Sequence, residues 1–180
     1  SREFAHTRRK NLLLRDLDEL VNQQLSKMMF ANPQRIDYYD RYQEIIDAYN
    51  AEQNRATIEK TFMDLMELAS SLDTERQRYV REGFSSDEEL SVYDLLFSEN
   101  LTKQEIETIK KVSVDLLTKI KQQIAKLDHW TDKQETKAIV DNLIRNTLWQ
   151  ELPNSYDVSD IQTYQKKIYE YVYMRYPEVA

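Results

Sequence analysis

The sequence predicts an all-α fold, an irregular multi-helix bundle of about seven helices with no sheet. Apolar residues recur at steps of three and four over most of the chain, as they do on one face of a helix. One glycine and three prolines among 180 residues are too few for the tight turns of a sheet protein. Several helix starts are marked by Ser or Thr three residues before Glu or Gln, a pattern that satisfies the first backbone N–H groups of a helix.

The first predicted helix covers residues 2 to about 31. A second helix starts at Asn32 and Pro33, because Asn is a good cap and Pro fits the first helical turn. The expected apolar stripe of the first helix is Leu13, Leu17, Leu20 or Val21, Leu25 and Met28. The expected stripe of the second helix is Ile36, Tyr39, Tyr42 or Gln43, Ile46 and Tyr49.

A third helix is predicted over residues 55–82, with a break or kink near residues 70–74. Gly83 follows it and suits the left-handed residue that ends many helices. Ser86 and Glu89 then form a predicted capping box, which starts a short helix. The expected inward residues of these two helices are Ile58, Phe62, Leu65, Leu68 or Ala69, Leu72, Leu90, Tyr93 or Asp94, Leu96 and Phe97.

Three more helices complete the chain. Their expected starts are Thr102 with Glu105, Thr131 with Gln134, and Asp157 or Ser159. Their expected apolar stripes are Ile106, Ile109, Val112, Leu116 or Leu117, Ile120, Ile124 and Leu127; Val140, Leu143 or Ile144, Thr147 and Leu148; and Ile161, Tyr164, Ile168 and Tyr171 or Val172. We expect residues 1–32 to be a long helix connecting to a preceding helical domain, and residues 33–180 to form a C-terminal all-helical domain.

The composition bears on the cellular compartment in which the protein is expected. The chain has no cysteine, which fits a reducing compartment. No apolar run approaches about 20 residues, so no membrane span is expected. The chain begins with a polar segment that lacks an initiator Met, so we expect it to be a piece of a larger, cytoplasmic protein.

The net charge of −7 argues against a dedicated nucleic-acid-binding domain, because phosphate recognition needs a cationic surface. The first turns of the first helix are an exception, with five basic residues opposed only by Glu3. Positive charge there opposes the helix macrodipole. Two interpretations stay open, a solvated face or a contact with an anionic partner. The five basic residues are Arg2, Arg8, Arg9, Lys10 and Arg15.

No catalytic or metal site is predicted. A phosphate-binding loop needs more than one glycine. Glu3 and His6 make a single Glu-x-x-His pair, whereas a di-metal bundle needs two, and His129 has no partner in the sequence that would complete a catalytic triad. A tyrosine cluster near the C-terminus is denser than one helix face can bury, so part of it is expected to meet another domain. The cluster consists of Tyr169, Tyr171, Tyr173 and Tyr176.

Several segments of the amino-acid sequence resemble those of a known family. These segments are SSDEELSVYDLLF, KKVSVDLLTKIK, the joint of Asp128, His129, Trp130 and Lys133, AIVDNLIRNTLWQELP and KIYEYVYMRYP. Their order resembles the C-terminal region of the motor (R) subunit of type I restriction–modification enzymes, most closely the IC group. The resemblance covers the chain from about Asp37 onward.

This resemblance implies a parent protein with a nuclease domain and two helicase-like ATPase domains, all upstream of these residues. The parent would use ATP and magnesium to translocate and cleave DNA, while this part would bind no cofactor and catalyse nothing. Its implied roles are docking onto the methyltransferase and specificity subunits and contact with duplex DNA. Residues that match the family motifs are Glu88, Glu89, Tyr93, Leu95, Leu96, Trp130, Lys133 and Lys137.

The motif residues divide by chemistry. Leu95 and Leu96 are expected in the core, and Trp130 at a helix entry is expected to fill a packing position. Lys133 and Lys137 are better suited to phosphate or acidic contacts, with a solvated face as the alternative. A restriction motor would gather the basic side chains on one face, namely Arg8, Arg9 and Lys10 with Lys110, Lys111, Lys133 or Lys137.

A second hypothesis is a helical interaction module of an unrelated multidomain protein, without a role in nucleic-acid binding. It predicts evenly scattered charge. Its partner would bind the acidic residues 87–89 or the tyrosine-rich C-terminal segment.

Overall fold

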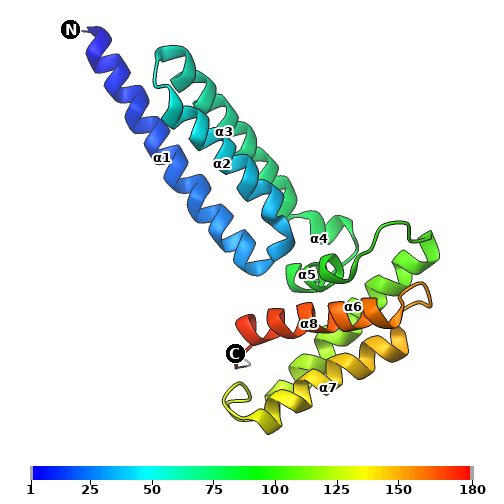
Figure 1. Cartoon of the computed structure of the whole chain (residues 1–180). Coiled ribbons are helices and arrows are strands. Elements are labelled where there is room, and N and C mark those ends of the chain that lie inside the picture. The colour runs from blue at the N-terminus through cyan, green and yellow to red at the C-terminus, as the bar shows by residue number, and fades with distance from the viewer. Residues whose placement is uncertain (1, 179–180) are drawn as a thin grey trace. The chain divides into compact units, whose positions relative to one another are not determined.

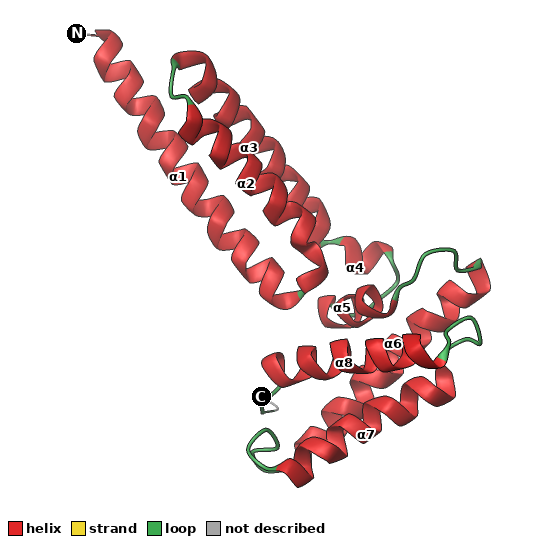
Figure 2. Ribbon diagram, in the orientation of Figure 1, coloured by secondary structure: helices red, strands yellow, loops and turns green. Residues whose placement is uncertain are grey.

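The computed structural model describes residues 2–178, except for the side chains of residues 3, 4, 5 and 7. Over this range the chain forms eight α-helices and one 3-10 helix, with no strand (Figure 2). The predicted all-α class is confirmed. The expected count of about seven was one short, because α4 (Arg78–Arg81) is a separate four-residue helix.

The helices form two compact units, which we describe separately. Unit 1 is Ser1–Arg81 and unit 2 is Glu82–Ala180. Residues 32 and 33, between which a boundary is expected, both lie in unit 1. Within this unit the first helix packs along the third.

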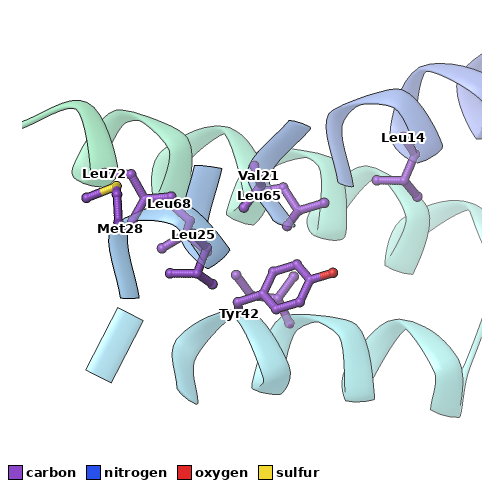
Figure 3. Packing of buried hydrophobic residues seen from close by; sticks show 9 residues of the cluster. Leu14, Val21, Leu25, Met28, Tyr42, Leu65, Leu68 and Leu72 are labelled. Carbon is purple, nitrogen blue, oxygen red and sulfur yellow. The ribbon is translucent and has the colours of Figure 1, made fainter. Parts of the chain in front are cut away.

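Unit 1 contains α1 (Arg2–Ala31), the 3-10 helix η1 (Pro33–Arg35), α2 (Ile36–Ala51), α3 (Arg55–Arg76) and α4. Figure 1 shows α1, α2 and α3 side by side, with α2 running opposite to the other two. α3 packs closely on both neighbours, whereas α1 and α2 contact each other less. The core side chains converge from all three helices (Figure 3): Leu14, Val21, Leu25, Met28, Tyr42, Ile45, Leu65, Leu68 and Leu72.

Part of the predicted apolar stripe in unit 1 was wrong. Leu13 is exposed, and Leu14 lies in the core in its place. Of the alternatives Leu20 and Val21, Val21 is the buried one, as one of the two predictions had it. Three consecutive leucines at residues 12–14 allow two phases of the same helical repeat, and only the neighbouring helices decide between them. In α2, Ile36 and Tyr39 are exposed, and the buried positions are Tyr42 and Ile45.

A buried ionic network joins the C-terminal end of α1 to the end of α3. Arg35 donates from Nε to Oε1 of Glu75 at 3.1 Å and from Nη1 to the Met28 carbonyl at 3.2 Å. Arg78 donates to the same carboxylate at 3.0 Å, and the Tyr38 hydroxyl donates to it at 3.3 Å. Burial alone would raise the pKa of Glu75, but the hydrogen bonds from the two arginines outweigh it and hold that pKa below its usual value.

Most signals at the helix ends of unit 1 agree with the structure. Asn32 caps η1 by accepting from the Gln34 N–H at 3.1 Å. The break expected near residues 70–74 lies slightly later, at Gln77 between α3 and α4. At the start of unit 2, Gly83 has φ +85°, the left-handed conformation predicted for it.

Unit 2 contains α5 (Asp87–Leu96), α6 (Lys103–Ala125), α7 (Gln134–Glu151) and α8 (Val158–Arg175). α6 packs on α7, α7 packs on α8, and α5 lies against α6 and α8. Six positions of the α6 stripe are fully buried, as predicted: Ile109, Val112, Leu116, Leu117, Ile120 and Ile124.

The capping boxes of unit 2 are confirmed in part. Thr102 and Glu105 form the complete box. Ser86 accepts from the Glu89 N–H at 3.3 Å, but the Glu89 carboxylate accepts from the N–H of Ser85 and not from that of Ser86. Asp157 caps α8, one of the two residues predicted for that position.

The box predicted at Thr131 was wrong. α7 begins at Gln134, and Lys133 occupies the cap position without a side-chain hydrogen bond. His129 has φ +46° in the preceding turn, a geometry that the sequence does not signal. The Thr136 hydroxyl donates to the carbonyls of Trp130 and Lys133 at 2.6 and 3.1 Å, which ties the turn to the helix.

Candidate functional site

The N-terminal half of α1 borders a groove, called the first groove here, with a volume of about 530 Å³. Its opposite wall is the C-terminal half of α2, and α3 forms its floor. It exists because α1 and α2 both pack on α3 and contact each other less. Its lining residues are Arg8, Asn11, Leu12, Leu14, Arg15, Asp18, Ile46, Tyr49, Thr61 and Leu65.

The groove is apolar inside and charged along the α1 wall. Leu14 and Leu65 are buried beneath it, while Leu12 is 53% exposed. Asp18 at one end accepts a 2.6 Å hydrogen bond from the Tyr42 hydroxyl. Burial and this bond to a carboxylate raise the pKa of Tyr42 to about 12, so the tyrosine stays a neutral donor.

A second groove of about 390 Å³ lies on the other side of α1, between α1 and α3. Leu13, Phe62 and Met63 line it. Among the side chains that the structure describes, its charged lining residues are Lys10 and Glu59, which pair at 2.8 Å. Hydrogen bonds from Lys10 and Arg55 lower the pKa of Glu59, so this pair stays charged and the groove carries no net charge.

The basic residues singled out in the sequence have different environments. Arg8 and Arg9 are exposed on α1. Lys110 bonds the Glu82 carboxylate at 3.1 Å and the Glu82 carbonyl at 3.0 Å, and its ammonium lies 5.9 Å from the centre of the Tyr93 ring. Lys110 therefore has a local structural role.

Three other lysines of unit 2 are free for outside contacts. Among the side chains that the structure describes, no carboxylate lies within 4.0 Å of Lys111, Lys133 or Lys137. Because α7 runs antiparallel to α6, Lys133 lies near the end of α6, about 20 Å along the helix axis from Lys111. Within unit 2 the predicted basic residues thus form two separate groups.

The motif residues act in the interior or at helix ends. Leu95 and Leu96 are buried, and the Tyr93 ring packs between Phe84 and Phe97. Glu88 pairs with Lys121 of α6. These residues hold α5 in place and offer little free surface.

Trp130 is fully buried, which confirms the packing position predicted for it. Its Nε1–H donates to the Tyr176 carbonyl at 2.7 Å, and its ring meets Tyr169 and Tyr173 edge-on. Tyr171 is buried as well and packs on Tyr176. The tyrosine cluster therefore packs within unit 2, although Tyr173 keeps part of its surface exposed.

In the described part of the chain, no group of three or more His, Cys, Asp and Glu side chains could hold a metal ion. His6 is exposed, and the Glu3 side chain lies outside the described residues. His129 contacts Glu178 at 3.1 Å. None of the helices described is long and apolar enough to cross a membrane.

The sequence matches the family described as type I restriction enzyme HindI endonuclease subunit-like, C-terminal, over residues 1–176. The chain belongs to this family. No curated protein and no solved structure matches the chain. The family match includes α1, so it extends the resemblance, first noted from about Asp37, to the N-terminal helix.

The first groove of this restriction-subunit domain was not predicted from the sequence. The first groove needs Leu12, Ile46 and Tyr49 to face one another across two helices, and no local pattern encodes that arrangement. A usable signal was the run of leucines at 12–14, where one helix face cannot bury all three side chains.

Proposed function

We propose that this chain is a non-catalytic helical domain through which a type I restriction endonuclease subunit docks onto its methyltransferase and specificity subunits, with a local cationic surface that contacts duplex DNA. The parent subunit would supply the nuclease and the ATP- and magnesium-dependent motor from upstream domains. The observation that carries the proposal is the family match over residues 1–176 to the C-terminal part of such a subunit.

The surface of unit 1 supports a docking role. In the described part of this unit, nine apolar side chains are buried and nine large apolar side chains are exposed. Contiguous exposed apolar surface on a soluble domain marks an interaction site more often than chance. One of these exposed side chains, Leu12, lines the first groove beside two arginines and the partly buried Ile46 and Tyr49.

The proposed DNA contact is argued from the positive charge of three lysines in unit 2. Lys111, Lys133 and Lys137 form no ion pair with a described carboxylate of the domain, so they are available to phosphates. Residues 82–180 hold 12 basic and 18 acidic side chains, whereas residues 1–81 hold 13 and 14. Any DNA contact of unit 2 would therefore be made by local cations against a net negative charge, and we expect it to weaken steeply with salt.

The test compares the full-length subunit with one that lacks residues 1–176 of this chain. We expect the truncated subunit to lose binding to the methyltransferase–specificity complex in size-exclusion chromatography, while its ATP hydrolysis chemistry persists. Full-strength assembly of the truncated subunit would contradict the proposal.

A second candidate is docking without any DNA contact, favoured by the excess of acidic residues in unit 2. The double charge reversal Lys133→Glu and Lys137→Glu separates the two candidates. If the domain contacts DNA, this variant weakens duplex binding at low salt more than the reversal Lys103→Glu with Lys166→Glu. Equal binding by both variants would favour docking alone.

A further inference from the structure

The first groove is an unfilled position in the helix packing of unit 1. α1, α2 and α3 leave it open along the N-terminal half of α1, where α1 and α2 are not in close contact. Leu12 on one wall and Ile46 and Tyr49 on the other face the opening, above a floor of Leu14 and Leu65. The groove thus has an apolar floor and apolar side chains on both walls, as a groove that receives a helix does.

The dimensions fit a short helix. The α1 wall runs from Arg8 to Asp18, and ten residues of α-helix extend about 15 Å. A partner segment of about three turns would cover this length, with apolar residues at steps of three and four facing the floor. It would take the place of a fourth helix in the unit.

The charge of the groove selects an acidic partner. Arg8, Arg15 and Asp18 line the α1 wall. The Asp18 carboxylate already accepts a hydrogen bond from the Tyr42 hydroxyl, whereas Arg15 makes an exposed 3.5 Å contact with Glu19. Among the described side chains, no carboxylate pairs with Arg8. The surrounding residues 2–15 hold five basic side chains and one acidic one.

Other occupants fit less well. Duplex DNA presents phosphates and no continuous apolar surface that could cover Leu12, Ile46 and Tyr49. A second copy that used the same groove would bring its own Arg8 and Arg15 against those of the first. The second groove has apolar walls too, but the Lys10–Glu59 pair neutralises its charge, and nothing selects a partner for it.

We infer that the first groove is the docking site for an acidic amphipathic helix of a partner subunit, which packs its apolar face between α1 and α2 and pairs its carboxylates with Arg8 and Arg15. The inference rests on the proposed docking function and names the surface that performs it.

The chain supplies a matched control. Leu12 and Leu13 are neighbours with nearly equal exposure, 53% and 52%, yet Leu12 lines the first groove and Leu13 the second. Lys27 is exposed on the same helix and lines neither groove. The double variant Arg8→Glu with Leu12→Gln is therefore compared with Lys27→Glu with Leu13→Gln. Both change the net charge equally and keep good helix formers at the surface.

Binding of the whole chain to the methyltransferase–specificity complex of the same system is measured by calorimetry, together with the melting temperature of each variant. We expect the groove variant to bind at least tenfold more weakly and the control to stay within about twofold of the original chain, with similar melting temperatures. A photo-crosslinking residue in place of Ile46 is expected to label an acidic amphipathic helix of that complex.

The outcomes separate the two proposals. No binding by the original chain would overturn both the docking function and the groove. Normal binding by the groove variant would overturn the groove alone. Crosslinking of Ile46 to a second copy of the chain, or displacement of the complex from the groove by duplex DNA, would also overturn the inference.

Discussion

The two units of the chain differ in how many of their apolar side chains are buried and how many stay exposed. In the described residues of unit 1, buried apolar side chains and exposed large apolar side chains are equal in number, nine each. Over residues 82–178, unit 2 buries 22 apolar side chains and exposes seven large ones. Both units are built mainly from long helices, so the difference lies in how completely the helices of each unit pack against one another.

Unit 2 closes its core with large aromatic residues. Trp130 comes from the joint between α6 and α7 and is covered by the tyrosines of α8. Unit 1 is fixed at one end by the buried network around Glu75 and stays open at the other, along the first groove. This difference fits the proposal that unit 1, whose first groove is open, carries the docking surface and that unit 2 supports it.

The largest expected loss of stability comes from the aromatic residue that fills the core of unit 2. Trp130→Ala removes a fully buried ring and should lower the free energy of unfolding by about 4 kcal/mol. Urea unfolding followed by circular dichroism measures the loss. Trp130→Phe keeps a ring but gives up the bond to the Tyr176 carbonyl, so its loss should be smaller. A loss below about 1 kcal/mol for the alanine variant would contradict the closing role.

The next largest loss of stability is expected from the buried ionic network around Glu75 in unit 1. Glu75→Gln leaves the buried guanidinium of Arg35 without its carboxylate and should cost about 3 kcal/mol. Amide hydrogen exchange in α1 and α3 measures it. The matched control is Glu67→Gln, whose contact with Arg41 is exposed and should contribute less than about 1 kcal/mol. Equal losses in the two variants would argue that the network does not hold unit 1 together.

The pH dependence of the same group provides a second control. The folded-state pKa of Glu75 lies below its ordinary value of 4.5, so the folded state favours the charged carboxylate. Its stabilising contribution is complete above pH 4.5 and is lost as the pH falls through the lower folded-state pKa. The stability gap between the original chain and Glu75→Gln should therefore narrow in acid. A constant gap would show that the charge of Glu75 is not the cause.

The smallest effect compares two predicted caps of unit 2. Thr102→Ala removes a complete capping box and should cost about 1 kcal/mol. Thr131→Ala removes a residue that the sequence also marked as a cap but that does not cap α7, so its cost should stay within about 0.5 kcal/mol. Thermal unfolding resolves the two. A larger loss at Thr131 would mean that the helix start of α7 lies where the sequence placed it.

The sequence predicts this fold well where the signals are local. Thr102 and Asp157 carry their own hydrogen-bonding partners three residues away, and α6 has a long repeat with one possible phase. Prediction fails where contacts between residues far apart in the sequence determine which side chains are buried or paired. The phase of residues 12–14 depends on α3, and the role of Lys110 depends on Glu82, 28 residues earlier. The first groove was not predictable because it depends on the packing of three helices at once.

Hydrogen–deuterium exchange of the chain, alone and bound to the methyltransferase–specificity complex, tests the contrast between the units most directly. The account predicts that binding slows exchange at residues 8–18 of α1 and at the C-terminal half of α2, and leaves α7 and α8 unchanged. Slower exchange confined to residues 134–175, with none at the first groove, would contradict it and would assign docking to unit 2.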